Sequence, residues 1–296
     1  MVRIVLGLIA VCLVSTGAAN ADTLIYGSVF TGPDAPSVLW EFAPNSGPTP
    51  VGIARRIGDI GFRRVGSLDF SPGGTLYGVG SVATTHETVL ITINTTTAAG
   101  TLVGSLGLGD RLFQDIAFRP SDGTLFGFAT GDIYTINITT GAATLVGSAG
   151  IGFPFGNSLA FQGTTLYYAN ESSLFTIDQA TGVATFVRDI NYPPAFGTDP
   201  RPPAMKFDPV SGTLWASVLG GFLGNTGSNL GTINPATGQT TVVRSLPPVT
   251  DGIAVTSGPP FAVVVPTLSE WAQMAMITVL ILVGLEALRR RRATLS

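Results

Sequence analysis

The chain contains very few of the side chains that most often carry enzyme chemistry. It has one cysteine, Cys12, one histidine, His86, and one lysine, Lys206. This shortage excludes disulfide bonds, histidine-rich metal sites and most nucleophile–base triads. We expect His86 to lie in a solvated loop, because its neighbours in VATTHETV are mostly polar. The sequence therefore predicts no catalytic residue.

Charge is also scarce: charged residues make up 11% of the chain, against about a quarter in ordinary proteins. Glycine is abundant, with 38 residues, and proline contributes 20. Together with many threonine and β-branched residues, this composition favours an all-β fold with tight turns over disorder. Residues 22–260 carry 16 acidic and 10 basic side chains, a net charge of −6. Nucleic-acid binding is disfavoured, because it needs clustered positive charge.

The first 21 residues have the pattern of a signal peptide. Arg3 makes the start basic, residues 4–14 form an apolar run, and Ala19-Asn20-Ala21 has the small-x-small pattern of a cleavage site. We predict removal of residues 1–21 and a mature chain that begins at Asp22. A retained anchor is the alternative, although the run is short for a membrane span. Cys12 lies inside this segment, so the predicted mature chain has no thiol.

Two short sequence units recur through residues 22–257. The first unit is an apolar strand, a turn and Thr-Leu-aromatic, and the second is Ile-Asn/Asp-x-x-Thr-Gly followed by Thr-x-Val. Copies of the first are SLDFSPGGTLYG, DIAFRPSDGTLFG, SLAFQGTTLYY and AMKFDPVSGTLWA, and copies of the second are TINITTGAATLVG, TIDQATGVATFV and TINPATGQTTVV. The second unit predicts a β-hairpin, because Asn or Asp starts the turn and Gly supplies a positive φ. Together the two units predict four short antiparallel strands per repeat, as in a propeller blade.

The spacing and the ends of the repeats predict five blades. The aromatics Phe70, Phe118, Phe161 and Phe207 are 48, 43 and 46 residues apart, within the propeller range. A lone first strand at 251–255 and a chain start at 23–27 without one complete each other. The sequence therefore predicts a five-bladed β-propeller, closed by its N- and C-terminal strands. An open sandwich or a β-solenoid is the alternative.

The repeats resemble those of secreted bacterial propellers with Leu-Tyr-x-Ile-Asp-x-x-Thr-Gly motifs. The resemblance covers about residues 22–257 and implies the propeller fold. It implies little about function, because propellers host many unrelated activities.

After a linker at 258–265, the C-terminal segment predicts a transmembrane helix. Residues 271–288 would form a helix of roughly 27 Å, just enough for a hydrocarbon core of about 30 Å. Trp271 would lie at one interface, and the following arginines would stay on the cytoplasmic side. A buried globular helix is the alternative. The predicted fold class is therefore an all-β propeller with a C-terminal transmembrane helix.

Residues 266–292 resemble the IPTL-CTERM sorting domain of Gram-negative bacteria. The matching residues are Pro266, Thr267, Leu268 and Trp271, followed by the basic cluster Arg289, Arg290, Arg291 and Arg292. Val265 replaces the usual Ile, and Ala272 replaces the usual Gly. The resemblance implies recognition of this sorting signal at the inner membrane by an exosortase-like processing enzyme.

Polar residues gather where the innermost strands are predicted to begin, at one mouth of the central channel. The predicted ligand set is Asp110, Gln114, Asp115, Asn157 and Asp251. Carboxylate and amide oxygens suit Ca²⁺, so a calcium site is one interpretation. The alternative is that these side chains cap strand starts through backbone bonds. Asp69 and Lys206 share one repeat position, so they could face each other across the axis or line a wet channel.

Two functions remain open on the sequence alone. One is a non-enzymatic binding module of the cell envelope or extracellular matrix, with an unidentified ligand or envelope partner. The other is a cation-dependent propeller hydrolase or lyase with its site at the channel mouth. In both cases we expect export through the inner membrane and anchoring by the C-terminal helix until processing. The propeller would lie in the periplasm or on the cell surface.

Overall fold

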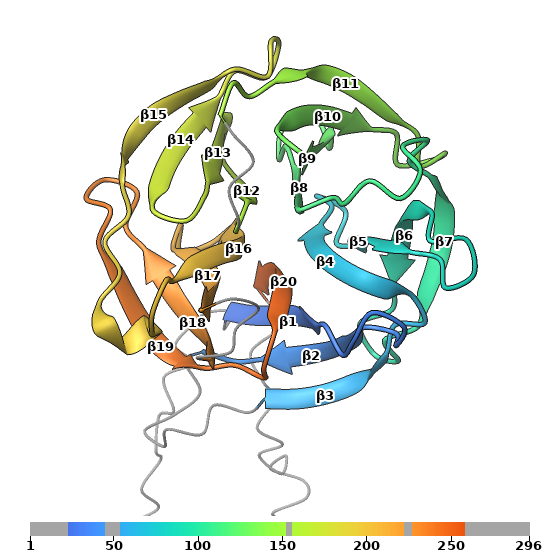
Figure 1. Cartoon of the computed structure of the whole chain (residues 1–296), viewed down its shortest axis with the longest axis horizontal. Coiled ribbons are helices and arrows are strands. Elements are labelled where there is room, and N and C mark those ends of the chain that lie inside the picture. Colours follow the sequence, from blue (N-terminus) through green and yellow to red (C-terminus); the bar gives the residue numbers. More distant parts are fainter. Residues whose placement is uncertain (1–22, 45–53, 152–155, 222–226, 258–296) are drawn as a thin grey trace, which may run out of the picture. The chain divides into compact units, whose positions relative to one another are not determined.

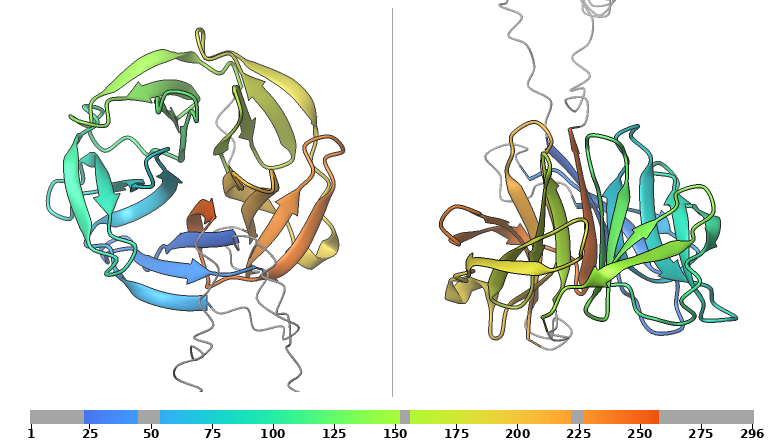
Figure 2. Two further views of the ribbon diagram at one scale, coloured as in Figure 1. Left: turned by 180° about the vertical axis from the view of Figure 1, so that it is seen from behind. Right: turned by 90° about the horizontal axis from the view of Figure 1, so that it is seen from above.

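Twenty strands form five four-stranded antiparallel sheets in the part of the chain that the computed structural model describes, residues 23–44, 54–151, 156–221 and 227–257. The sheets stand as blades around a central channel (Figure 1). Figure 2 shows the same ring from behind and edge-on. The predicted five-bladed propeller is confirmed.

Each blade runs from an inner strand at the channel to an outer strand at the rim, as Figure 1 shows. From inner to outer, the strands are β20 (Thr250–Ser257), β1 (Thr23–Val29), β2 (Val38–Phe42) and β3 (Ala54–Asp59) in blade 1; β4 (Arg63–Phe70), β5 (Leu76–Ser81), β6 (Thr88–Ile93) and β7 (Gly100–Ser105) in blade 2; β8 (Asp115–Phe118), β9 (Leu125–Ala129), β10 (Asp132–Ile136) and β11 (Ala143–Ser148) in blade 3; β12 (Ser158–Gln162), β13 (Thr165–Ala169), β14 (Ser173–Ile177) and β15 (Ala184–Asp189) in blade 4; and β16 (Arg201–Phe207), β17 (Leu214–Gly220), β18 (Gly227–Ile233) and β19 (Thr240–Ser245) in blade 5.

Blade 1 is built from both ends of the propeller sequence. Strand β20 pairs antiparallel with β1, with Ile25 opposite Val255 and Gly27 opposite Ile253. The predicted closure by two complementary half-repeats is therefore confirmed, and the sandwich and solenoid alternatives are wrong. Closure matters physically because pairing with β20 covers the inner edge that β1 would otherwise leave open.

One part of the predicted fold class is corrected. It included a C-terminal transmembrane helix, but no helix among the described residues is long and apolar enough to cross a membrane. The helix that the described residues do contain is a single 3-10 turn, η1 (Pro194–Phe196). Apolar side chains of the described chain are instead buried by strands that pack blade against blade. The predicted span, residues 271–288, lies outside the described residues.

The repeated aromatics join neighbouring blades. In each case, the aromatic of a blade's second strand packs on the first-strand aromatic of the next blade. The pairs and their ring-centroid distances are Tyr26–Phe70 (5.6 Å), Tyr77–Phe118 (5.3 Å), Phe126–Phe161 (5.6 Å) and Tyr167–Phe207 (5.7 Å). At the fifth interface Trp215 and Val255 share one core cluster. Aromatic pairs in this geometry stabilise a fold by about 0.5–1.5 kcal/mol each beyond the effect of burial. The aromatic positions recur in the sequence because each of them forms a contact between neighbouring blades.

The hairpin glycines have a second role besides the turn. Asn137 starts the blade 3 hairpin by accepting the N–H groups of Thr139 and Thr140 at 2.9 and 3.1 Å. Gly141 closes the hairpin with φ +81° and touches the outer strand of blade 2. A Cβ at Gly141 would lie 2.5 Å from the carbonyl carbon of Gly104. The hairpin of one blade thus rests on the rim of the preceding blade.

Candidate functional site in the central channel

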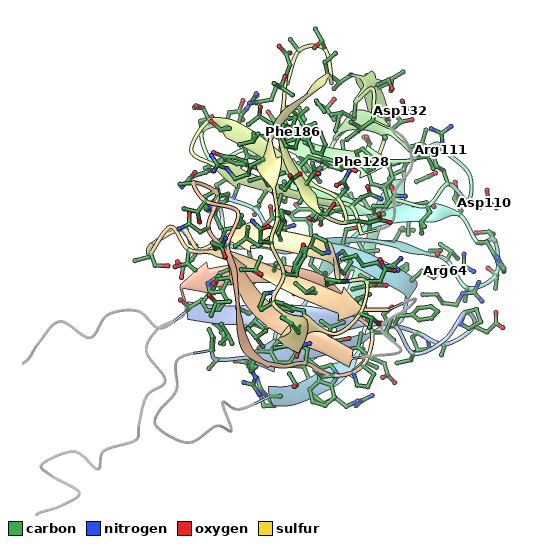
Figure 3. All side chains as sticks on the ribbon, turned by 60° about the vertical axis from the view of Figure 1, so that its left-hand side comes forward. Arg64, Asp110, Arg111, Phe128, Asp132 and Phe186 are labelled. Carbon is green, nitrogen blue, oxygen red and sulfur yellow. The ribbon has the colours of Figure 1, made fainter. Side chains whose placement is uncertain are left out.

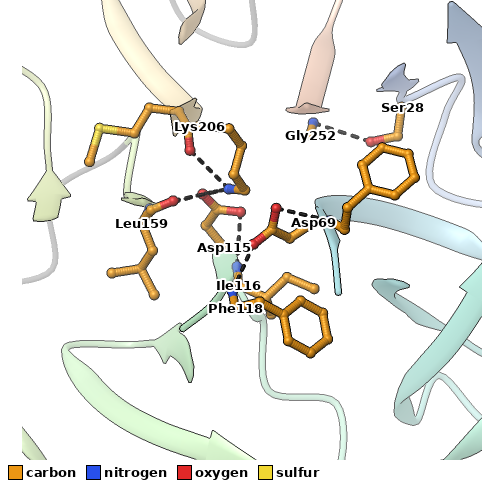
Figure 4. A network of polar contacts seen from close by, with 10 residues as sticks. Ser28, Asp69, Asp115, Ile116, Phe118, Leu159, Lys206 and Gly252 are labelled. Carbon is orange, nitrogen blue, oxygen red and sulfur yellow. Dashed lines mark hydrogen bonds and ion pairs between the residues drawn. The ribbon is translucent and has the colours of Figure 1, made fainter. Parts of the chain in front are cut away.

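Four charged side chains from the inner strands gather at the channel. They are Asp69 on β4, Asp115 on β8, Lys206 on β16 and Asp251 on β20; the fifth inner strand, β12, has the uncharged sequence SLAFQ. Figure 4 shows Asp69, Asp115 and Lys206 converging from three blades. Hydrogen bonds and charge join Asp69, Asp115 and Lys206, whereas no described contact joins Asp251 to them, so we call the three joined residues the channel cluster.

Lys206 is the centre of the cluster. Its ammonium Nζ lies 2.7 Å from Asp115 Oδ2 and donates to the carbonyls of Leu159 and Met205 at 3.0 and 2.9 Å. An ammonium has three protons, so these contacts use all of its donors. Lys206 and Asp115 are both buried. The ion pair therefore ties blade 5 to blades 3 and 4 in a place shielded from water.

The two carboxylates nearest Lys206 also bind backbone across blade boundaries. Asp115 accepts the N–H of Ile116 at 2.8 Å and the N–H of Leu159, in the next blade, at 2.9 Å. Asp69 accepts the N–H of Phe70 at 2.9 Å and the N–H of Phe118, in the next blade, at 2.7 Å. The cluster thus links blades 2, 3, 4 and 5 in sequence.

Burial controls the protonation of these carboxyl groups. It raises the pKa of Asp69 to about 6, although the charge of Lys206 and two backbone N–H bonds act against the shift. Burial likewise raises the pKa of Asp115, and the close ammonium of Lys206 opposes it. Desolvation disfavours the charged form of a carboxyl group. Both groups therefore hold a proton more tightly in the folded protein than in the unfolded chain.

Asp251 stands apart from the channel cluster. Burial alone raises its pKa to about 6. Within the described residues it has no hydrogen-bond or ion-pair partner, and its Oδ2 lies beside blade 2, 3.9 Å from where a Cβ of Gly66 would be. The same repeat position is occupied by uncharged residues in the other four blades, namely Gly66, Gln114, Asn157 and Pro203. Asp251 is thus the charged residue among these five equivalent positions.

The two amides of the predicted ligand set, Gln114 and Asn157, form hydrogen bonds within their own blades. Gln114 Oε1 accepts the N–H of Thr130 at 3.1 Å, and Asn157 Oδ1 accepts the hydroxyl proton of Tyr168. Each amide thus holds a loop or strand of its own blade. In the described part of the chain, no group of three or more His, Cys, Asp or Glu side chains could hold a metal ion.

Asp110 lies outside the channel row, in a small surface cleft between blade 2 and the segment leading to blade 3 (Figure 3). Arg64, Thr88 and Leu112 line the same cleft, whose volume of about 10 Å³ gives room for about one water. His86 is exposed in the loop between β5 and β6, as its sequence context predicted.

Sequence reasoning placed Asp69 and Lys206 in the channel but missed the main ion pair. Lys206 reaches Asp115, which lies two residues before Ala117, the blade 3 counterpart of Asp69. Side chains two apart on a strand share a face. That periodicity was the available signal that Asp115 belongs with Asp69.

Comparisons with known proteins support the fold. No family model and no curated protein matches the chain. A chain of the solved structure "Crystal structure of Nidogen/Laminin Complex" is similar with a TM-score of 0.50 and 12% identity, over 79% of this chain and 97% of that chain. A chain of "Kuenenia stuttgartiensis Hydrazine Synthase" has a TM-score of 0.40 and 18% identity, over 62% of this chain and 50% of that chain. The first likeness is one of fold, and the second is too distant to carry an argument.

Proposed function

We propose that this protein is an exported β-propeller that binds a component of the cell envelope or extracellular matrix and catalyses no reaction. The observation that carries the proposal is the use of the channel charges. Lys206 donates all its protons within the protein, and Asp69 and Asp115 each accept two backbone N–H groups. A general acid or base must be able to reach the proton it transfers. These three side chains instead hold blades together.

A fold analogy points in the same direction. The similar chain in the nidogen/laminin structure comes from a complex of proteins. Propellers present loops of several blades on one face, which suits recognition of a large partner. At 12% identity the likeness transfers the architecture, and the binding role of the present chain is our proposal.

The sequence signals at the two ends support the location. Residues 1–21 have the pattern of an export signal, and Pro266, Thr267, Leu268 and Trp271 match the sorting motif. We infer that an exosortase-like enzyme at the inner membrane recognises that motif. The propeller then resides in the periplasm or on the cell surface, in contact with its envelope partner.

A binding assay tests the proposed function. The purified full-length chain would be titrated with peptidoglycan, lipopolysaccharide and exopolysaccharide from the producing bacterium. We expect saturable binding to at least one of them, with the ligand unchanged in mass after prolonged incubation. Calcium and a chelator should leave the binding constant unchanged. Shortened or unsaturated ligand fragments that accumulate with protein concentration would instead show a hydrolase or lyase.

A further inference from the structure

We propose that the propeller contains a proton-controlled closure, in which ionisation of Asp251 weakens the contact between the closing strand and blade 2. This control would act on the ring itself, whatever the propeller binds. It rests on the position of Asp251, on the charges around it and on its counterparts in the other blades.

The closing strand fixes Asp251 against the next blade. Strand β20 pairs with β1 and packs on β4, β16 and β17. Its Gly252 donates to Ser28 Oγ at 3.2 Å, an interaction visible in Figure 4. A Cβ at Gly252 would lie 3.0 Å from the carbonyl oxygen of Gly66. Asp251 therefore sits at a tight junction, where the C-terminal strand meets blade 2.

No neighbouring cation compensates the Asp251 carboxylate. The ionisable side chains on the strands packed against β20 are Tyr26 on β1, Arg63, Arg64 and Asp69 on β4, and Arg201 and Lys206 on β16, while β17 has none.

These ionisable groups are engaged elsewhere or exposed. Arg63 pairs with Asp34 at 2.9 Å, and Arg201 pairs with Asp199 at 2.5 Å. Lys206 has no free proton, and Arg64 is exposed. The Tyr26 hydroxyl cannot neutralise an anion, and Asp69 would add negative charge. Asp251 is half-buried, so its ionised form places a charge with no counter-ion among the described residues at the junction between β20 and blade 2.

Protonation of Asp251 stabilises the folded protein relative to the unfolded chain. Burial raises the pKa of Asp251 from 3.8 to about 6 in the folded protein. The stabilisation from its bound proton is complete below the unfolded value and is lost as the pH rises through about 6. A pKa raised from 3.8 to about 6 corresponds at most to roughly a 100-fold change in the folded-to-unfolded ratio, because Asp251 is only half-buried and water screens part of its charge. The ring should therefore loosen between mildly acidic and mildly alkaline pH.

Asp251→Asn provides the test, because blade 4 already has an asparagine, Asn157, at this position. Melting temperatures of the full-length wild type and variant would be compared between pH 4.5 and pH 8.5. We expect the two to agree near pH 4.5 and the variant to melt roughly 5 °C higher at pH 8.5. Asp110→Asn, at an exposed aspartate, is the matched control and should follow the wild type at every pH.

A second measurement keeps the proposal independent of unfolding. Carboxyl ¹³C resonances of the wild type should include one that titrates near pH 6 and is absent from Asp251→Asn. Parallel melting profiles for the two proteins would overturn the proposal. So would an Asp251 resonance that titrates near pH 4, or a variant less stable than the wild type at pH 8.5.

Discussion

Replacing Lys206 with methionine should destabilise the propeller by about 3–5 kcal/mol at pH 8, because it leaves a buried carboxylate without its partner. Asp115 is fully buried, and Lys206 is its only ion-pair partner within the described residues. Urea denaturation followed by tryptophan fluorescence would measure the loss. Because Lys206 opposes the raised pKa of Asp115, the variant's Asp115 should bind its proton still more tightly. The penalty should therefore be smaller at pH 5 and grow as the pH rises.

Two further variants separate the ion pair from a general effect of losing a lysine. Lys206→Met combined with Asp115→Asn should recover part of the lost stability, because the buried Asp115 carboxylate is no longer left unpaired, while Asp69 still loses the nearby charge of Lys206. Arg56→Met removes a half-exposed cation paired with Asp59 and should cost less than about 1 kcal/mol. A Lys206→Met protein as stable as the wild type at pH 8 would show that the channel cluster does not hold the blades.

Alanine at Gly141 should destabilise the protein far more than alanine at Gly74, although both glycines have nearly the same φ, +81° and +82°. A left-handed alanine costs about 1–2 kcal/mol at either position. At Gly141 the new Cβ would also meet the Gly104 backbone at 2.5 Å, whereas nothing lies within 4 Å at Gly74. Overpacking adds about 1–3 kcal/mol, giving a total of about 2–5 kcal/mol at Gly141.

Urea denaturation of the two glycine variants measures the difference directly. The Gly74→Ala protein is the control for backbone strain alone, since its side chain would point into open space. Equal destabilisation of the two variants would mean that the contact between neighbouring blades contributes nothing. The account would then lose its explanation of why this turn signature recurs from blade to blade.

The sequence predicted the blades because each blade repeats the same contact. The aromatic of each Thr-Leu-aromatic strand packs on the first-strand aromatic of the next blade. Tyr77 and Phe118 form one such pair, and equivalent residues form it at other blade boundaries. The half-repeats at 23–27 and 251–255 predicted closure for the same reason. The close approach of Gly141 to Gly104 could not be derived, because a turn signature reports only local φ and not the neighbouring blade.

The channel was harder to predict than the ring. Repeat alignment placed Asp69 and Lys206 at one depth, yet the partner that Lys206 reaches depends on side-chain length and on which blade stands across the axis. Asp115 is that partner, with its Oδ2 2.7 Å from Lys206 Nζ. Asp110 was grouped with the mouth residues by sequence adjacency, although the loop before β8 carries it to a surface cleft. The position of a residue in a loop does not determine where its side chain points. The position of a residue on a strand does determine which face of the sheet its side chain occupies.

Intact-mass measurement of the protein from its native host tests the central claim, the proposal that this is an exported propeller delivered to the envelope through its terminal signals. The account predicts a mature chain that begins at Asp22 and lacks Arg289, Arg290, Arg291 and Arg292. Pro266→Ala combined with Trp271→Ala should leave the arginines in place, because the processing enzyme would no longer recognise its motif. A native product that retains Met1 or Arg292 would contradict the account.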